Sequence, residues 1–151
     1  MEMTVKRILL PKLPTDIIDE VYKSIEVGTN QAFEGDNASY KTDQYAWIAA
    51  NQIVQDWCNA NISPDIYWGV QVITSDMPVH KDLGTQLKFN YIIDSGGDNV
   101  VTNFYNDNFE LTSSTTCDLN TWYILDVATH HDVKNIEQGK QRVSITGRIL
   151  P

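Results

Sequence analysis

The chain has 151 residues, of which 42% are hydrophobic, so its length and composition suit one folded domain with one core. Its 20 acidic and 11 basic residues give a formal net charge of −9, which repels phosphate backbones and anionic lipid surfaces. Non-specific binding to nucleic acid or to an anionic membrane is therefore disfavoured.

The cysteines and the first residues predict a soluble, cytoplasmic protein. Cys58 and Cys117 lie far apart and in no metal or redox spacing, so we expect two free thiols. Residues 1–7 lack the apolar core of a signal peptide, and no run approaches the roughly 20 apolar residues of a membrane helix.

The start of the chain predicts a short strand and a helix. The apolar run Lys6–Leu10 is interrupted by Pro11, which favours an edge strand because proline cannot donate to a ladder. Pro14 and Thr15 then open a helix, with Thr15 as its N-cap and Gly28 as its expected end.

Residues 29–40 are polar and have no clear period, so we expect a loop. From about Thr42 to Asn59, apolar residues recur three and four apart, which predicts a second helix with one face on a core.

After Pro64 the pattern changes to period two, which is typical of strands. We expect a bend at Met77–Pro78 and a strong turn at Ser95–Asn99. The expected strands cover residues 67–74, 85–94, 100–105, 109–112, 121–127 and 141–149. Two helices followed by short strands indicate helices that back a sandwich or barrel.

Two histidines and a carboxylate form a candidate metal site. His80 and Asp82 stand two apart, so both point to one face of an extended segment. The second histidine is His130 or His131, since only one of two neighbours faces inward, and the sequence that follows favours His131. We expect His130 to be packed or solvent-facing. Two His and one carboxylate form the facial arrangement of non-haem Fe(II) oxygenases.

The last expected strand has one polar, doubly cationic face. Arg142, Ser144, Thr146 and Arg148 alternate with residues that are largely apolar. If this face points to solvent, the strand is simply amphipathic. If it points inward, Arg142 and Ser144 form a charge-assisted clamp for a carboxylate.

Together, His80-Lys-Asp82, His131-Asp-Val-Lys-Asn135 and Arg142-Val-Ser144 resemble the motifs of the 2-oxoglutarate/Fe(II)-dependent oxygenase superfamily, in particular its small phage-encoded and microbial members. The resemblance covers about residues 67–150. It implies a mainly β fold, the double-stranded β-helix or jelly roll. One oxygenase-like domain would then span residues 1–151, with helical support in 1–64 and the jelly-roll core in 65–151.

The resemblance also implies roles for the motif residues. His80, Asp82 and His131 would bind Fe(II). Arg142 and Ser144 would hold the far carboxylate of the co-substrate 2-oxoglutarate. With O₂, such enzymes convert 2-oxoglutarate to succinate and CO₂ and hydroxylate a C–H bond of a primary substrate.

Further residues are candidates for co-substrate binding. Arg148 would be a second anchor, for the near carboxylate or for the substrate. Asn90 would donate or accept a hydrogen bond. Lys88 shares its face, and Tyr91 replaces Asn90 if the register is shifted by one residue.

The primary substrate is the least determined part. The chain leaves little room for a lid beyond residues 29–40 and a possible rim at 113–120, which favours a peptide or protein side chain or a free amino acid. The paired arginines keep a nucleic-acid substrate open despite the acidic balance. Two alternatives are a cupin-like metal-binding protein, which would usually need more histidines and a glutamate, and a non-catalytic jelly-roll module, which would leave the polar face of the last strand unexplained.

Overall fold

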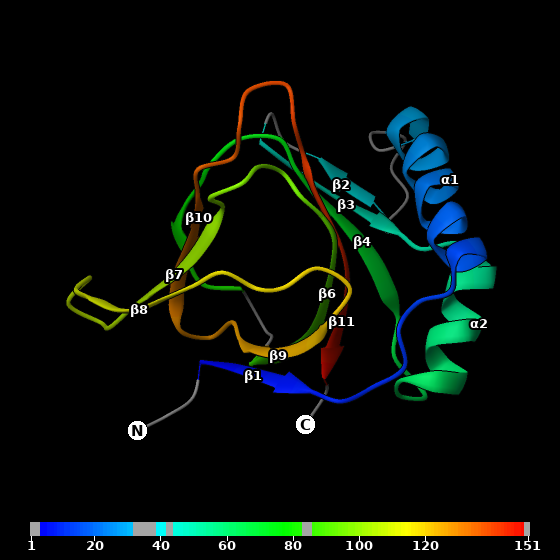
Figure 1. The fold of residues 1–151 in the computed structure, drawn as a ribbon, viewed down its shortest axis with the longest axis horizontal. Helices are drawn as coiled ribbons and strands as arrows, with labels where there is room; N and C mark the ends of the chain where they lie inside the picture. Colours follow the sequence, from blue (N-terminus) through cyan, green and yellow to red (C-terminus); the bar gives the residue numbers. More distant parts are fainter. Residues whose placement is uncertain (1–3, 32–38, 42–43, 83–85, 150–151) are drawn as a thin grey trace.

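The computed structural model describes residues 4–31, 39–41, 44–82 and 86–149. Within this part of the chain there are two helices and eleven strands (Figure 1). The helices are α1 (Thr15–Gln31) and α2 (Gln52–Asn61).

The strands form two sheets in which every pair is antiparallel. The larger sheet contains β1 (Val5–Ile8), β2 (Ser39–Lys41), β3 (Tyr45–Ala49), β4 (Trp68–Ile73), β6 (Leu87–Ser95), β9 (Trp122–Asp126) and β11 (Arg142–Ile149). The smaller sheet contains β5 (Met77–His80), β7 (Val101–Tyr105), β8 (Leu111–Thr115) and β10 (His130–Lys134). Their strand orders are β1-β9-β6-β11-β4-β3-β2 and β5-β10-β7-β8.

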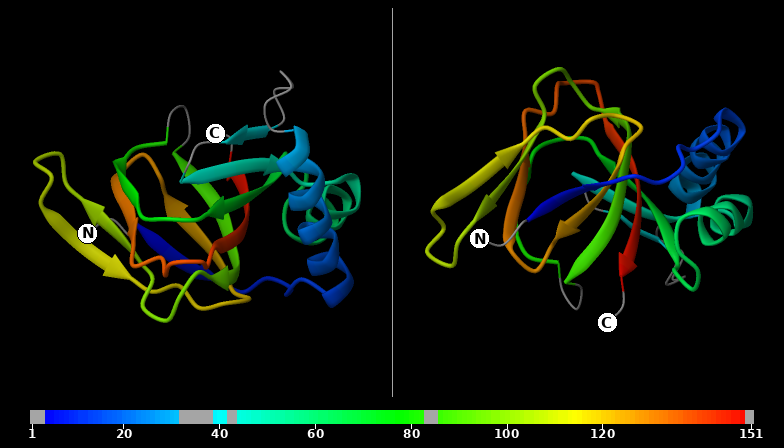
Figure 2. Two further views of the ribbon diagram at one scale, coloured as in Figure 1. Left: turned by 90° about the horizontal axis from the view of Figure 1, so that it is seen from above. Right: turned by 60° about the horizontal axis from the view of Figure 1, so that its bottom comes forward.

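From β4 to β11 the chain passes back and forth between the two facing sheets. Strands β4, β6, β9 and β11 lie in the larger sheet, and β5, β7, β8 and β10 in the smaller one. Figures 1 and 2 show the two sheets enclosing a common interior. This is the double-stranded β-helix, or jelly roll, so the predicted fold class is confirmed.

The two helices cover the outer face of the larger sheet (Figure 1). Apolar residues of both helices pack there against Trp68, Trp122 and Ile145 of the sheet. Gln55 of α2 is buried and fixes the helix to β4, since its side chain accepts from the Trp68 amide and donates to the Trp68 carbonyl, at 2.8 and 2.6 Å. No helix in the described residues has the length and apolar character needed to span a membrane.

One predicted helix is wrong over its first half. Residues 45–49 form strand β3, and only then does Asn51 cap α2, where its side chain accepts a hydrogen bond from the Val54 amide at 3.1 Å. The sequence Tyr45-Ala-Trp-Ile-Ala49 satisfies a helical spacing and a strand propensity alike. Pairing with β4 decides in favour of the strand. The first 64 residues therefore supply three strands of the larger sheet as well as both helices.

Strand β10 was not among the expected strands, and the remaining differences concern α1, β2 and β5. Helix α1 continues beyond Gly28 to Gln31, and residues 39 and 40 of the expected loop belong to β2, while 32–38 lie outside the described residues. The expected bend at Met77–Pro78 is part of β5. Pro78 is tolerated there because β5 is an edge strand of its sheet. Cys58 and Cys117 are free thiols, as predicted.

Candidate metal centre

Three potential ligands meet where β5 ends beside β10. His80 lies directly opposite His131 across these two strands, and Asp82 follows two residues after His80. One ligand atom from each of the three side chains lies within 4.8 Å of the others. The Asp82 oxygen Oδ1 is 3.4 Å from Nε2 of His80 and 3.3 Å from Nε2 of His131. The three residues singled out from the sequence are therefore brought together.

The opposite ring nitrogens determine which atoms face this centre. Nδ1 of His80 is 2.7 Å from the Pro78 carbonyl oxygen, and Nδ1 of His131 is 2.7 Å from the Thr129 carbonyl oxygen. A carbonyl oxygen only accepts, so each Nδ1 carries a proton and donates it. In the neutral rings, both Nε2 lone pairs then face the Asp82 carboxylate. This arrangement suits a divalent cation bound by two imidazoles and one carboxylate.

The electrostatics of the centre favour an ionised Asp82. Burial alone raises the pKa of this carboxyl, but its contacts with His131, His80 and Lys88 outweigh burial and hold the pKa well below its usual range. The hydrogen bond to Asp82 is the main cause of a raised pKa at His80. Without a metal, His80 and Asp82 thus favour the charged pair that a bound cation would replace.

His130 lies on the opposite face of β10. Its ring centroid is 4.7 Å from that of Phe109, and its Nδ1 atom is 3.8 Å from Oδ1 of Asp107. Successive strand residues point to opposite faces, so His130 is directed away from the three ligand side chains.

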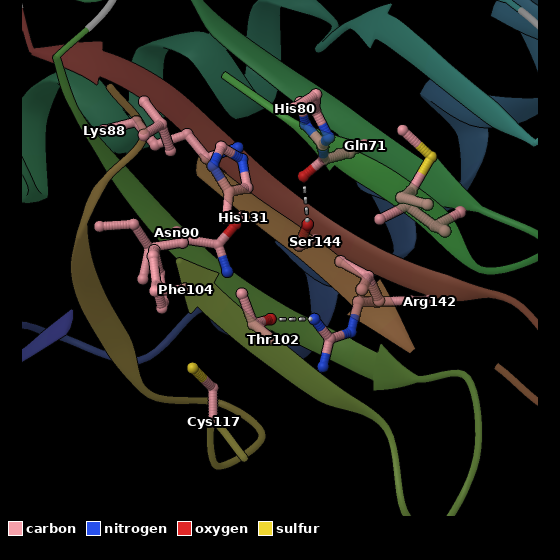
Figure 3. A pocket seen from close by; sticks show the side chains of 15 residues that line it. Gln71, His80, Lys88, Asn90, Thr102, Phe104, Cys117, His131, Arg142 and Ser144 are labelled. Atoms are coloured by element: carbon pink, nitrogen blue, oxygen red, sulfur yellow. Dashed lines mark hydrogen bonds between the residues drawn. The ribbon is translucent and has the colours of Figure 1, made fainter. Parts of the chain in front are cut away.

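A pocket between the sheets adjoins the metal centre (Figure 3). His80 and His131 line it together with polar side chains from β4, β6, β7 and β11: Gln71, Lys88, Asn90, Thr102, Arg142 and Ser144. Arg142 and Ser144 are 5% and 1% exposed, so this part of the polar face of β11 points inward rather than into solvent.

Arg142 is a buried cation for which the described residues supply no acidic partner. Its guanidinium donates to Thr102 Oγ1 at 3.2 Å and to the Ser95 carbonyl at 3.4 Å. Among the described residues, no carboxylate lies within ion-pair distance of it. Burial lowers the pKa of Arg142, which reflects the cost of keeping the charge there. An anionic ligand in the pocket would compensate this cost.

The remaining candidates divide between pocket, core and surface. Asn90 is buried and lines the pocket. Tyr91 faces the helices instead, where its hydroxyl accepts from the Leu13 amide at 3.2 Å, so the alternative register does not apply. Arg148 is exposed at the end of β11, opposite Lys88, and is not among the residues that line the pocket. Its placement does not support the expected role as a second anchor.

Gln71, Thr102 and Cys117 were not singled out from the sequence but line the same pocket. Gln71 lies beside Ser144, with 3.4 Å between its Oε1 and the hydroxyl oxygen. The signal that could have indicated it is a polar residue within the otherwise apolar run Trp68–Ile73. For Thr102 and Cys117 the sequence offers no such signal.

Comparison with known proteins supports the fold. No protein-family model matches the sequence, and no curated protein sequence does. An oxidoreductase of the 2OG-Fe(II) oxygenase family from Burkholderia pseudomallei has a similar structure, with a TM-score of 0.56 and 8% identity over 95% of this chain and 94% of that one. The two chains therefore share a fold over almost their whole length.

Another similar structure is hydroxypropylphosphonic acid epoxidase from S. wedmorenis in complex with fosfomycin, with a TM-score of 0.49 and 9% identity over 74% of this chain. The match spans about half of the epoxidase, 54% of its chain. Procruciferin, an 11S globulin from Brassica napus, matches with a TM-score of 0.46 and 9% identity over 76% of this chain and 28% of its own. Fold and site together define a jelly-roll protein with a candidate His-Asp-His metal centre.

Proposed function

We propose that this protein is a 2-oxoglutarate- and Fe(II)-dependent dioxygenase. The observation that carries the proposal is the buried guanidinium of Arg142, which has no acidic partner among the described residues and lines the same pocket as His80 and His131. A metal-binding jelly roll without an acidic co-substrate has no need of such a cation, and burying it is costly.

The residues of the centre fit Fe(II). His80, Asp82 and His131 would supply two imidazole nitrogens and one carboxylate oxygen, the donor set typical of non-haem Fe(II) oxygenases. Bound iron would supply the O₂ chemistry that side chains cannot perform. The hydrogen bonds from the two Nδ1 atoms to backbone carbonyls would hold both rings in the orientation and tautomer that ligation requires.

The far end of the pocket would bind the co-substrate. Arg142 would pair with the far carboxylate of 2-oxoglutarate, and the Ser144 hydroxyl would donate a hydrogen bond to it. Thr102 accepts from the guanidinium and so orients it. The Asn90 side chain, between the arginine and the metal centre in Figure 3, would form a further hydrogen bond.

The overall reaction converts 2-oxoglutarate, O₂ and a substrate C–H bond into succinate, CO₂ and the hydroxylated product. Apolar side chains that include Phe104, Val127 and Val133 line the pocket and would exclude water from it. As primary substrate we propose a peptide or protein side chain or a free amino acid.

The direct test is anaerobic addition of Fe(II) and 2-oxoglutarate to the purified protein. We expect a visible charge-transfer band that neither component gives alone. A folded protein without this band would contradict the proposal. Succinate release stimulated by peptides, free amino acids or modified bases would then identify the substrate class.

A further inference from the structure

The pocket contains a second buried cation, Lys88, on the side of the metal centre (Figure 3). Lys88 lies in β6 between β9 and β11, and its side chain is 10% exposed. A buried ammonium is costly unless a negative group compensates it. Within the described part of the chain, the carboxylate found within ion-pair distance is that of Asp82, with 3.8 Å between Nζ and Oδ2.

The two oxygens of Asp82 therefore have different neighbours. Oδ1 faces the Nε2 atoms of both His80 and His131. Oδ2 faces Lys88. One oxygen of the carboxylate thus faces the position where a metal would bind, and the other faces the ammonium group.

The backbone fixes both partners of this contact. The Asp82 amide donates to the Val127 carbonyl at 2.9 Å, and the Val127 amide donates to the Gln86 carbonyl at 2.9 Å. Gln86 stands two residues before Lys88, whose own position is set by pairing with Leu125. Leu125 of β9 and Val127, just after that strand, thus hold the lysine and the aspartate in one arrangement.

A carboxylate can bind a divalent cation through one oxygen or through both. We propose that Lys88 is a positioning residue that engages Oδ2 of Asp82, so that Asp82 offers only Oδ1 to the metal. The inference rests on the proposed metal role of Asp82 and deepens it. Two imidazole nitrogens and one carboxylate oxygen leave three positions of a six-coordinate ion open, enough for a two-donor keto acid and one more ligand. Chelation by both Asp82 oxygens would occupy one of these three open positions.

The test counts the open positions. Mn(II) is bound to the wild-type protein and to Lys88→Met, a neutral variant of similar length, and water-proton relaxation measures the waters on the ion. Lys88→Arg preserves the charge, and Lys6→Met is a control at an exposed position. We expect about one metal-bound water fewer in Lys88→Met than in the wild-type protein, and wild-type water counts in Lys88→Arg and Lys6→Met. Lys88→Met should also bind 2-oxoglutarate about tenfold more weakly, as for other groups that orient a metal ligand.

Removal of one partner from a buried ion pair is destabilising, so circular dichroism checks the fold of each variant. If Lys88→Met does not fold, Lys88→Gln serves as the neutral variant. A wild-type water count in the folded neutral variant would overturn the inference, and so would a failure of the wild-type protein to bind Mn(II). A wild-type protein that binds Mn(II) but no 2-oxoglutarate would contradict the proposed function, while the water count would still decide the role of Lys88.

Discussion

His80 and His131 lie opposite each other across the β5–β10 pair, with ring centroids 4.4 Å apart and both Nε2 atoms directed at one oxygen of Asp82. Segments that are 51 residues apart in the chain thus supply the two imidazoles. The smaller sheet carries the candidate ligands His80 and His131, with Asp82 just after β5, and the larger sheet carries the candidate anion-binding residues Arg142 and Ser144. The proposed reaction would take place between the two sheets.

His131→Ala should abolish the charge-transfer band, because it removes one of the three proposed metal ligands. His130→Ala is the matched control, since the neighbouring ring faces away and contacts Phe109. It should retain the band and bind Fe(II) with wild-type affinity. The reverse result, in anaerobic titrations followed by visible absorption, would show that His130 is the ligand.

Arg142→Met should weaken 2-oxoglutarate binding by roughly 30-fold or more, because loss of one partner of a buried charge pair costs about 2–5 kcal/mol. Fe(II) affinity should change little, since the guanidinium contacts Thr102 and Ser95 rather than the ligands. Arg148→Met, at an exposed position, should change 2-oxoglutarate affinity less than about threefold. Titration of each folded variant with 2-oxoglutarate measures this affinity. Equal losses of affinity in Arg142→Met and Arg148→Met would support Arg148 as a second anchor.

Tyr105→Phe should destabilise the fold by about 1–3 kcal/mol, the cost of leaving a buried polar group without a partner. Asp132 is 1% exposed and accepts from the Tyr105 hydroxyl at 2.7 Å and from Asn103 Nδ2 at 2.9 Å. Tyr67→Phe is a suitable control because Tyr67 is 61% exposed, and it should change stability by less than about 0.5 kcal/mol. Urea unfolding measures the free energy of unfolding of both variants. Equal changes in Tyr105→Phe and Tyr67→Phe would show that the hydrogen bond from Tyr105 to Asp132 contributes nothing to stability.

Stability should fall at alkaline pH partly because of Cys58. Burial raises the pKa of this thiol from 9.0 to about 12, so the unfolded chain loses the proton first as the pH rises. The contribution is complete below about pH 9 and is lost between about pH 9 and 12, at about 1.4 kcal/mol per pH unit. Cys58→Ala has no thiol to titrate and does not lose this contribution. The difference in the free energy of unfolding between wild type and variant should therefore shrink by about 2 kcal/mol from pH 8 to pH 10.5. A constant gap in urea unfolding would contradict the expectation.

Alternation in a two-sided sheet is a local property, so the sequence predicted most strands and a helix-backed sandwich or barrel, while the jelly roll followed from the resemblance of the motifs. It also predicted that His80 and Asp82 share a face and that Arg142 and Ser144 share one, but only the structure shows that the face of Arg142 and Ser144 points inward. Strand β3 was missed because Tyr45, Ile48 and Ala49 also fit a helical spacing, and only pairing with β4 decides between the two. The contact of Lys88 with Asp82 depends on how β9 holds both, and no pattern along the chain contains that information.

The central position of β11 has a consequence for how the site can be assembled during synthesis. It is the last strand of the described chain, yet it alone connects β1-β9-β6 with β4-β3-β2 in the larger sheet. A nascent chain that ends at Lys134 already contains His80, Asp82 and His131, but its larger sheet is split in two with open edges on both sides of the gap. Such edges pair readily with other chains, and long-range pairing of this kind is slow to form. The proposed metal ligands would thus leave the ribosome before the strand that closes the pocket behind them, and both sheet edges would stay open until β11 is added.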